Sequence, residues 1–379
     1  MKVVVAIDSF KGSLSSEEAA RSISEGIRAA RGDAEISVCP LADGGEGTVA
    51  ALASALGAEY TEVTVSDPIR RPVRCEYAVS EKGGEMTAIM EMSAAAGITL
   101  VSGSEKDPRV TTTYGVGEMI ADALSRGCRR FVVGIGGSAT NDGGIGMLAA
   151  LGYKFYDKEG TLIPPYGAQA AGRVSRIDAS GVRKELSESR FLVACDVKNP
   201  LCGSNGCSAV FSPQKGATAE CAKEMDAELS TYAGVVRLFN PSADMNAPGA
   251  GAAGGLGFAF LAFLDASLVP GAELVIRECG LEDMIREADV VVTGEGRMDL
   301  QSAMGKAPSA VAAVAKKYEK RVIAFCGAVG GTDDPICADI DAVFPIPTAP
   351  TTLEAAMDKP NAHRNLRFTA EQVFRVISD

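Results

Sequence analysis

The sequence predicts an α/β protein: a doubly wound parallel sheet interrupted by a large second α/β domain. At the N-terminus, the apolar runs VVVAID (residues 3–8) and EISVCPLAD (35–43) are each followed, after a short connection, by a helical stretch. This alternation is typical of parallel strands with helices between them. The alternation stops near residue 61 and resumes near residue 289. The intervening residues therefore predict a separate domain.

The elements of the outer domain follow from the spacing of apolar residues. Residues 16–30 and the C-terminal residues predict helices with one apolar face. Ser15 and Glu18 have the spacing of an N-terminal capping box. After residue 289, DVVVTGEG, RVIAFCG and AVFPI predict strands, with a helix near 304–318. The apolar faces of the two terminal helices comprise Ala20, Ile23, Ile27, Ala30, Leu366, Ala370, Val373 and Ile377.

Five such strands with intervening helices fit a flavodoxin-like sheet of strand order 2-1-3-4-5. We assign residues 1–60 and 288–379 to this discontinuous domain and residues 61–287 to the inserted α/β domain. An alternative places the strands near residues 131 and 191 in the same large sheet.

The insert begins as a meander. TEVTV, VRCEYAVSE and MTAIMEMS predict strands, separated by the turn segments DPIRRP and EKGG. A helix near 114–126, the strands before GIGGSATNDGGIG (134–146) and in FLVACD, and a helical stretch at 217–239 complete it.

Composition excludes several classes of protein. The chain has 37 Lys and Arg against 49 Asp and Glu, a net charge of -12, and no basic run with interleaved aromatics, so nucleic acid is not expected as a partner. The longest charge-free run, 247–264, is half small residues, which argues against a membrane helix. Ten scattered cysteines without an export signal predict a cytoplasmic protein with reduced thiols. The single histidine, His363, and the absence of CxxC pairs argue against zinc, and no GxSxG segment supports a hydrolase triad.

Charged residues collect where the predicted parallel strands end. In open α/β sheets, ligands bind at the carboxyl ends of the strands, near the point where the strand order reverses. Here strand one ends with Asp8 and Lys11, and strand three ends with Glu295, Arg297 and Asp299. The second strand adds one more carboxylate, Asp43.

Glycine clusters mark further candidate sites in the insert. GIGGSATNDGGIG has six glycines, which permit close approach of the backbone to a ligand. The segment GAGAAGGLG (249–257) leads into an apolar helix and offers N–H groups for an anion. The alternative explanation is a buried turn for the first segment and tight helix packing for the second. The candidate residues in these segments and at the end of FLVACD are Gly136, Gly137, Ser138, Thr140, Asn141, Asp142, Gly251, Gly254, Gly255 and Asp196.

Six colinear motifs carry a resemblance to a known family. They are DSFKGSLSS (8–16), LADGGEGT (41–48), GIGGSATNDGG (134–144), ACDVKNPLCG (194–203), GAGAAGGLG (249–257) and TGEGRMDLQS (293–302). Together they resemble the type I glycerate kinase family over the whole chain. The resemblance implies a cytoplasmic enzyme that uses ATP and Mg²⁺ to phosphorylate D-glycerate, usually to 2-phospho-D-glycerate, on a flavodoxin-like domain and a second α/β domain. We expect the transfer to take place in a cleft between the domains.

The candidate residues then take roles in phosphoryl transfer, which depends on positioning and charge neutralisation. Asp196 is the first choice for the base that accepts the hydroxyl proton, and Asp8 the second. Lys11 and Arg297 would bind the substrate carboxylate or the transferring phosphoryl group. Asp43, Glu295 and Asp299 are candidates for Mg²⁺, of which the ion would take one or two. The residues of the two glycine segments would contact substrate or phosphate.

Two other functions stay open from sequence alone. The chain could phosphorylate another small hydroxy acid, or it could be a non-catalytic sensor of small acids. The number of carboxylates at strand ends argues against the sensor, because an anion pocket without a metal has little use for them. Homo-oligomerisation and the nucleotide preference are left open.

Overall fold

The computed structural model describes residues 1–41, 48–299, 307–330 and 338–377. Contacts between Cα atoms divide these residues into two compact units. The first unit comprises the N-terminal residues, Ala50–Leu56, and the chain from Gly271 onward; the second comprises Gly57–Pro270 together with the described residues Thr48 and Val49. The return to the first unit at Gly271 lies upstream of the sequence-based boundary at 288, because two helices precede the next strand.

The sheet of the first unit has five parallel strands in the order β13-β12-β11-β1-β2. In chain order this is 2-1-3-4-5, the flavodoxin-like order that the sequence predicts. The alternative is wrong, since the strands near 131 and 191 lie in another sheet. The strands are β1 (Lys2–Val5), β2 (Glu35–Val38), β11 (Val290–Met298), β12 (Arg321–Val329) and β13 (Ala342–Pro345).

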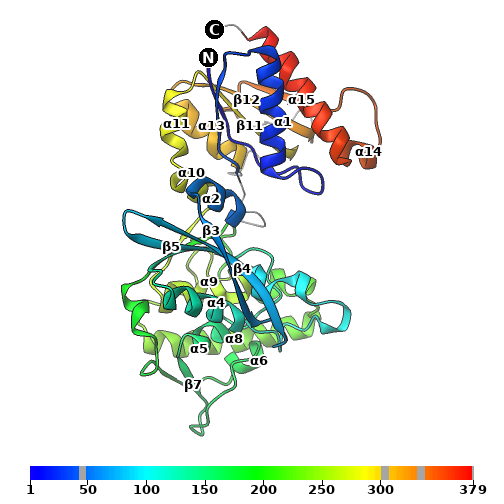
Figure 1. Cartoon of the computed structure of the whole chain (residues 1–379). Helices are drawn as coiled ribbons and strands as arrows, with labels where there is room; N and C mark the ends of the chain where they lie inside the picture. The colour runs from blue at the N-terminus through cyan, green and yellow to red at the C-terminus, as the bar shows by residue number, and fades with distance from the viewer. Residues whose placement is uncertain (42–47, 300–306, 331–337, 378–379) are drawn as a thin grey trace. The chain divides into compact units, whose positions relative to one another are not determined.

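Helices cover the faces of this sheet. On one face α1 packs against α15, seen in blue and red in Figure 1, and together they bury an apolar layer over β1 and β11. The predicted capping box begins α1: Glu18 N donates to Ser15 Oγ (3.1 Å), and Ser15 N donates to Glu18 Oε2 (2.9 Å). The helices of this unit are α1 (Ser16–Ala30), α2 (Thr48–Leu56), α10 (Gly271–Glu278), α11 (Leu281–Glu287), α13 (Ala307–Lys317), α14 (Leu353–Met357) and α15 (Lys359–Val376).

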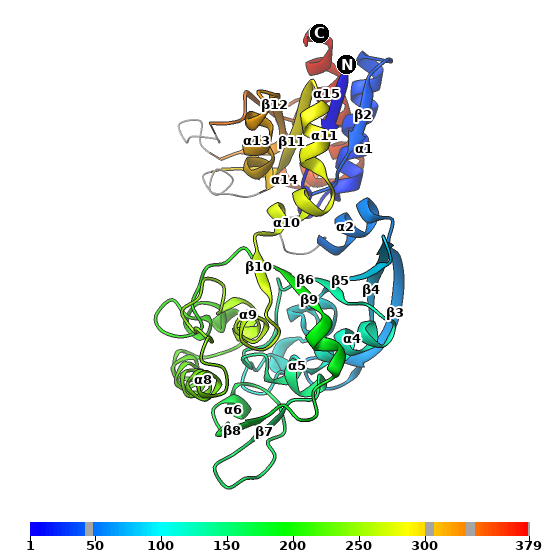
Figure 2. The same cartoon turned by 90° about the vertical axis from the view of Figure 1, so that its left-hand side faces the viewer.

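The sheet of the second unit has six strands in the order β10-β9-β6-β5-β4-β3, which can be followed across Figure 2. The predicted meander is present: β3, β4 and β5 pair antiparallel. From β5 to β10 the pairing is parallel. The strands are β3 (Glu59–Ser66), β4 (Pro72–Lys82), β5 (Glu85–Glu91), β6 (Arg130–Gly134), β9 (Arg190–Ala194) and β10 (Ser267–Val269).

Helices and a small two-stranded sheet complete the second unit. This sheet pairs β7 (Lys154–Tyr156) antiparallel with β8 (Arg176–Asp178); these strands are too short for a periodic sequence signal. In the described part of the chain, no helix is both long and apolar enough to cross a membrane. The helices are α3 (Ser93–Ala96), α4 (Tyr114–Ser125), α5 (Ile145–Ala150), α6 (Ala168–Ala171), α7 (Cys207–Phe211), α8 (Ala219–Phe239) and α9 (Ala252–Phe263), with 3₁₀ turns at Ile98–Leu100, Gly103–Glu105, Lys184–Glu188 and Pro213–Lys215.

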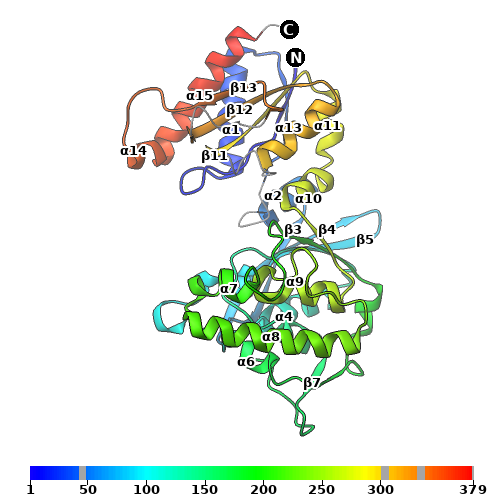
Figure 3. The same cartoon turned by 180° about the vertical axis from the view of Figure 1, so that it is seen from behind.

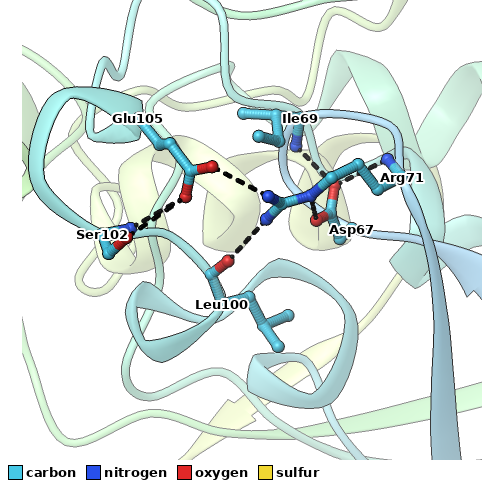
Figure 4. A network of polar contacts seen from close by, with 6 residues as sticks. All are labelled: Asp67, Ile69, Arg71, Leu100, Ser102 and Glu105. Atoms are coloured by element: carbon cyan, nitrogen blue, oxygen red, sulfur yellow. Dashed lines mark hydrogen bonds and ion pairs between the residues drawn. The ribbon is translucent and has the colours of Figure 1, made fainter.

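A polar network holds the turn between β3 and β4 (Figure 4). Arg71 forms ion pairs with Asp67 (2.6 Å) and Glu105 (2.8 Å) and donates to the carbonyl oxygen of Leu100 (2.9 Å). Asp67 is 3% exposed and also accepts from the backbone N–H groups of Arg71 and Ile69. Because buried carboxylates need such partners, this network fixes the predicted turn against the loop that follows α3.

Candidate functional site

A cavity of about 410 Å³ lies in the first unit. Its polar part is lined by residues that follow β1 and by the end of β11, where the sequence predicts a site. Asp8, Lys11, Glu295, Arg297 and Asp299, all predicted site residues, line this one cavity. The reason is the parallel register: Val5 pairs with Val292, so the carboxyl ends of the two strands meet at one edge.

The acidic residues differ in exposure. Asp8 is 4% exposed and accepts a hydrogen bond from Ser9 N (2.6 Å), which fixes the carboxylate at the end of the strand. Glu295 is 8% exposed, and its negative charge, after burial, helps raise the pKa of the neighbouring Cys326 to about 12. Asp299 is half-buried and lies 3.7 Å from Arg297 Nε. The side chain of Arg297 is 70% exposed, so the guanidinium stands at the open side of the cavity.

Glycines bring the backbones around this cavity together. A Cβ on Gly296 would lie 3.3 Å from the Cα of Phe10, so the end of β11 runs against the loop after β1. Gly12 has φ +79°, and a Cβ there would lie 2.7 Å from Met357 Cε. A side chain at either position would displace a cavity-lining residue.

The cavity has some of the oxygen ligands that a cation would need. Among the described residues, no three His, Cys, Asp or Glu side chains come close enough together to hold a metal ion. Glu295 and Asp299 do line the same cavity, and Mg²⁺ needs only one or two carboxylates when phosphate oxygens and water supply the rest. The third predicted ligand, Asp43, lies outside the described residues.

A second set of predicted residues lies at one edge of the sheet in the second unit. Gly134 pairs with Ala194 of β9 and with Glu91 of β5, so the chain segments after these strands leave the sheet together. Asp196, two residues after β9, is exposed. Glu91 is a candidate that the sequence analysis missed, although it ends an apolar strand as the others do; Ser93 Oγ lies 3.4 Å from its Oε2.

The segment 134–146 divides into an accessible part and a buried part. Gly137 is exposed, Gly136 is half-buried and Ser138 is 8% exposed. Gly137 has φ +72°, and the nearest atom to a Cβ there, Ser93 Cβ, would be 3.7 Å away. Within this segment, only the first part, residues 136–138, is accessible enough to contact a ligand.

The carboxylate of Asp142 is held by hydrogen bonds within the protein. It is fully buried and accepts hydrogen bonds from Thr113 N (2.8 Å), Thr113 Oγ1 (2.9 Å), Gly144 N (3.1 Å) and Gly146 N (3.4 Å). Burial raises its pKa, and these donors oppose the rise. Asp142 thus ties the loop to the start of α4, and Thr113 is a partner that the sequence analysis missed.

The glycines of the segment 249–257 approach protein backbone. A Cβ on Gly254 would lie 2.1 Å from the carbonyl oxygen of Thr140, and one on Gly251 would lie 2.2 Å from that of Pro200. Gly255 would meet Gly143 Cα at 2.8 Å, and Gly143 N donates to Gly254 O (2.9 Å). The two glycine-rich segments therefore pack against each other, the alternative that sequence left open.

A lysine that the sequence analysis did not single out is buried beneath this loop. Lys215 is 1% exposed, and its Nζ donates to Ser138 Oγ and to the carbonyl oxygen of Thr140, both at 2.6 Å. Burial lowers the pKa of Lys215 to about 8, while the charges of Cys207 and Asp142 act in the opposite direction. A lysine in the segment SPQKG looks like an exposed turn residue in sequence.

Two polar atoms near Lys215 have no hydrogen-bond partner within the described chain: Thr140 Oγ1 and Asn141 Oδ1. Both residues are fully buried, and Asn141 Nδ2 donates to Ser208 Oγ (2.9 Å). Buried polar atoms usually have partners, so these two atoms are exceptions among the described residues.

Ligands of open α/β sheets bind at the carboxyl ends of the strands, and the charged residues and glycine loops at these ends suit an enzyme that acts on an anionic small molecule. A family model described as the glycerate kinase family matches residues 3–378. The chain belongs to this family, and it is a phosphotransferase whose activity is the ATP-dependent phosphorylation of glycerate.

Curated relatives and a solved structure are similar along nearly the whole chain. Glycerate 2-kinase of Escherichia coli (strain K12) is 45% identical and covers 94% of this chain and 93% of its own. Glycerate kinase of Haemophilus influenzae is 43% identical over 100% of this chain and 99% of its own. A crystal structure described as glycerate kinase 2 from Salmonella typhimurium LT2 superposes with a TM-score of 0.89, at 43% identity over 99% of this chain and 97% of that one.

Proposed function

We propose that this chain transfers the γ-phosphoryl group of ATP to the 2-hydroxyl of D-glycerate in the cytoplasm, giving 2-phospho-D-glycerate and ADP. The cavity of the first unit carries the proposal, because it combines carboxylates with two cations at the strand ends of a glycerate kinase family member. The name of the Escherichia coli relative, glycerate 2-kinase, supports the position of transfer. The described cysteines are all free thiols, in keeping with a reducing compartment.

In the proposed reaction the 2-hydroxyl oxygen attacks the γ-phosphorus in line. A new O–P bond forms, the bond from phosphorus to the β,γ-bridging oxygen breaks, and ADP leaves. The hydroxyl proton passes to a carboxylate. Asp196 and Asp8 are the two candidates, the first exposed at the end of β9 and the second held in the cavity by the Ser9 N–H.

Lys11 and Arg297 bind the substrate carboxylate or the transferring phosphoryl group. Both line the cavity. Arginine suits this role because its planar guanidinium can donate two parallel hydrogen bonds to a carboxylate or phosphoryl group.

Glu295 and Asp299, with Asp43, would hold Mg²⁺. When bound, the ion would supply positive charge that offsets the negative charge of the phosphate groups. The chain's part is to supply one or two carboxylates at the strand end, and two of the three predicted ligands line the cavity.

The accessible start of the glycine loop, Gly136, Gly137 and Ser138, contacts substrate or phosphate in this proposal. The deeper residues hold the loop in shape by the contacts described above. This set comprises Thr140, Asn141, Asp142, Gly251, Gly254 and Gly255.

The test is ADP release from the purified protein with ATP, Mg²⁺ and D-glycerate, followed by ³¹P NMR of the product. A 2-phosphoglycerate signal supports the proposal; a 3-phosphoglycerate signal moves the attack to the other hydroxyl. Greater turnover with another small hydroxy acid would reject glycerate as the preferred substrate.

The two candidate bases are compared by Asp196→Asn and Asp8→Asn. Loss of the base lowers kcat while the KM for ATP changes little. The variant that keeps near-normal kcat identifies the carboxylate that is not the base.

A further inference from the structure

The cavity of the first unit has a second wall that phosphoryl transfer does not use. Opposite in character to the strand ends, this apolar wall is formed by the segment after β13 and by α14, which joins α15 (Figure 3). Its members are Ile346, Pro347, Leu353, Ala356 and Met357.

The apolar wall is incompletely covered. Leu353 is 76% exposed, Pro347 is exposed, and Ala356 and Met357 are half-buried, whereas Ile346 is 4% exposed. A single exposed leucine is ordinary, but a contiguous apolar wall inside a concave site is the usual lining for a ligand.

The size of the cavity exceeds what glycerate requires. Its volume of about 410 Å³ lies within the range of about 300–1,000 Å³ in which pockets enclose drug-sized ligands. A three-carbon acid has no apolar face to cover Leu353 and Met357. A nucleotide has both a flat heterocycle and a chain of phosphates, matching a cavity with one apolar and one charged part.

A hydrogen-bonding group stands in the same lining. Asn365 of α15 lines the cavity, and its Oδ1 accepts only a long hydrogen bond from Thr348 Oγ1 (3.5 Å). Within the described chain its Nδ2 makes no hydrogen bond. A carboxamide offers a donor and an acceptor side by side, which can pair with the edge of a purine.

We propose that the apolar wall binds the adenine ring of ATP, that Asn365 hydrogen bonds to the edge of the ring, and that the phosphates extend toward Lys11 and Arg297. This inference rests on the proposed function for the identity of the nucleotide. It places the adenine ring of the nucleotide in the first unit.

The first test is calorimetric titration of the full-length protein with ADP and, separately, with pyrophosphate. Leu353→Asp places a carboxylate where the ring would lie, at a position exposed enough to tolerate it. We expect the Kd for ADP to rise about tenfold or more while the Kd for pyrophosphate and the KM for glycerate stay within twofold of wild type. Val376→Ser, which removes an apolar side chain that is 82% exposed on α15 and outside the cavity lining, is the matched control.

An unchanged Kd for ADP in Leu353→Asp overturns the inference, as does an equal rise for ADP and pyrophosphate. A rise in the KM for glycerate without a rise in the Kd for ADP indicates that the apolar wall binds glycerate, and this result also overturns the inference. A third outcome separates the two proposals. If wild-type protein binds ADP in a way that depends on Leu353 but does not phosphorylate glycerate, the proposed function is rejected and the inference is supported.

The second test measures how the enzyme selects between ATP and GTP. Asn365→Leu removes the paired donor and acceptor while keeping the bulk. We expect the ratio of kcat/KM for ATP to that for GTP to change about tenfold. An unchanged ratio removes Asn365 from the site.

Discussion

The buried ammonium of Lys215 predicts a specific dependence of stability on pH. Its pKa is about 8 in the folded chain, against an ordinary value of 10.5. Below pH 8 the lysine is protonated in both states, and the folded state carries the whole cost of burying the charge. Between about pH 8 and 10.5 the unfolded chain binds more protons than the folded chain, so stability rises with pH.

The magnitude follows from the difference between 10.5 and about 8. At 1.36 kcal/mol per pH unit, the full effect is about 3 kcal/mol. About 1 kcal/mol of this is recovered between pH 7 and pH 9, and between 2 and 3 kcal/mol by pH 10.

The assay is urea denaturation of wild type and Lys215→Met at pH 7, 8, 9 and 10, with a reducing agent present. Other groups titrate in this range: burial raises the pKa of Cys75 and of Cys207 to about 11, and these thiols lower stability as the pH rises. Cys75 is present in both proteins and cancels in the difference, whereas Cys207 interacts by charge with Lys215, so the comparison is made again in a Cys207→Ser background to isolate Lys215. We expect that difference to change by about 1 kcal/mol in favour of wild type from pH 7 to pH 9. A difference independent of pH would refute the burial of a charged lysine at this position.

Other variants test the remaining sites. Arg297→Lys should raise the KM for glycerate severalfold because lysine lacks the paired donors, and unchanged kinetics would remove Arg297 from the site. Gly254→Ala should abolish folding or cost more than about 3 kcal/mol, since its Cβ would overlap the Thr140 carbonyl, whereas Gly137→Ala should cost about 1 kcal/mol, the strain of its φ alone; equal thermal stability of the two would contradict the packing described. Arg71→Met should lower the free energy of unfolding measured in urea, because the buried Asp67 would lose its cationic partner, with Arg71→Gln as the control that keeps a hydrogen-bond donor.

The strand order of the first unit could be predicted because two stretches with the same β–α alternation flank a segment without it. The boundary at 271 could not, since α10 and α11 follow one another without a strand to mark the return. The convergence of Asp8 and Glu295 could also be predicted, from the rule that parallel strands end at the same edge of a sheet. Both residues line the one cavity.

The missed residues depend on contacts between distant parts of the chain. Lys215 is buried and donates to Ser138 and Thr140, more than seventy residues earlier in the chain. The glycines indicated close approach correctly, but a glycine pattern does not distinguish approach to a ligand from approach to backbone. Gly254 and Gly137 are examples of the two environments, one filled by a carbonyl and one open.

The pairing of β1 with β11 has a consequence for biosynthesis. Val3 pairs with Val290, so β1, which lies between β2 and the central strand β11, acquires its second neighbour only after most of the chain has been made. During translation, β1 and β2 can pair, while the other edge of β1 stays without hydrogen-bond partners and the residues of the second unit emerge. An unpaired strand edge with an apolar run such as residues 3–7 is a site for aggregation, and high sequence separation slows closure of the sheet. We therefore expect this edge to be prone to aggregation until β11 emerges, so truncation before residue 298 should leave a product of low solubility.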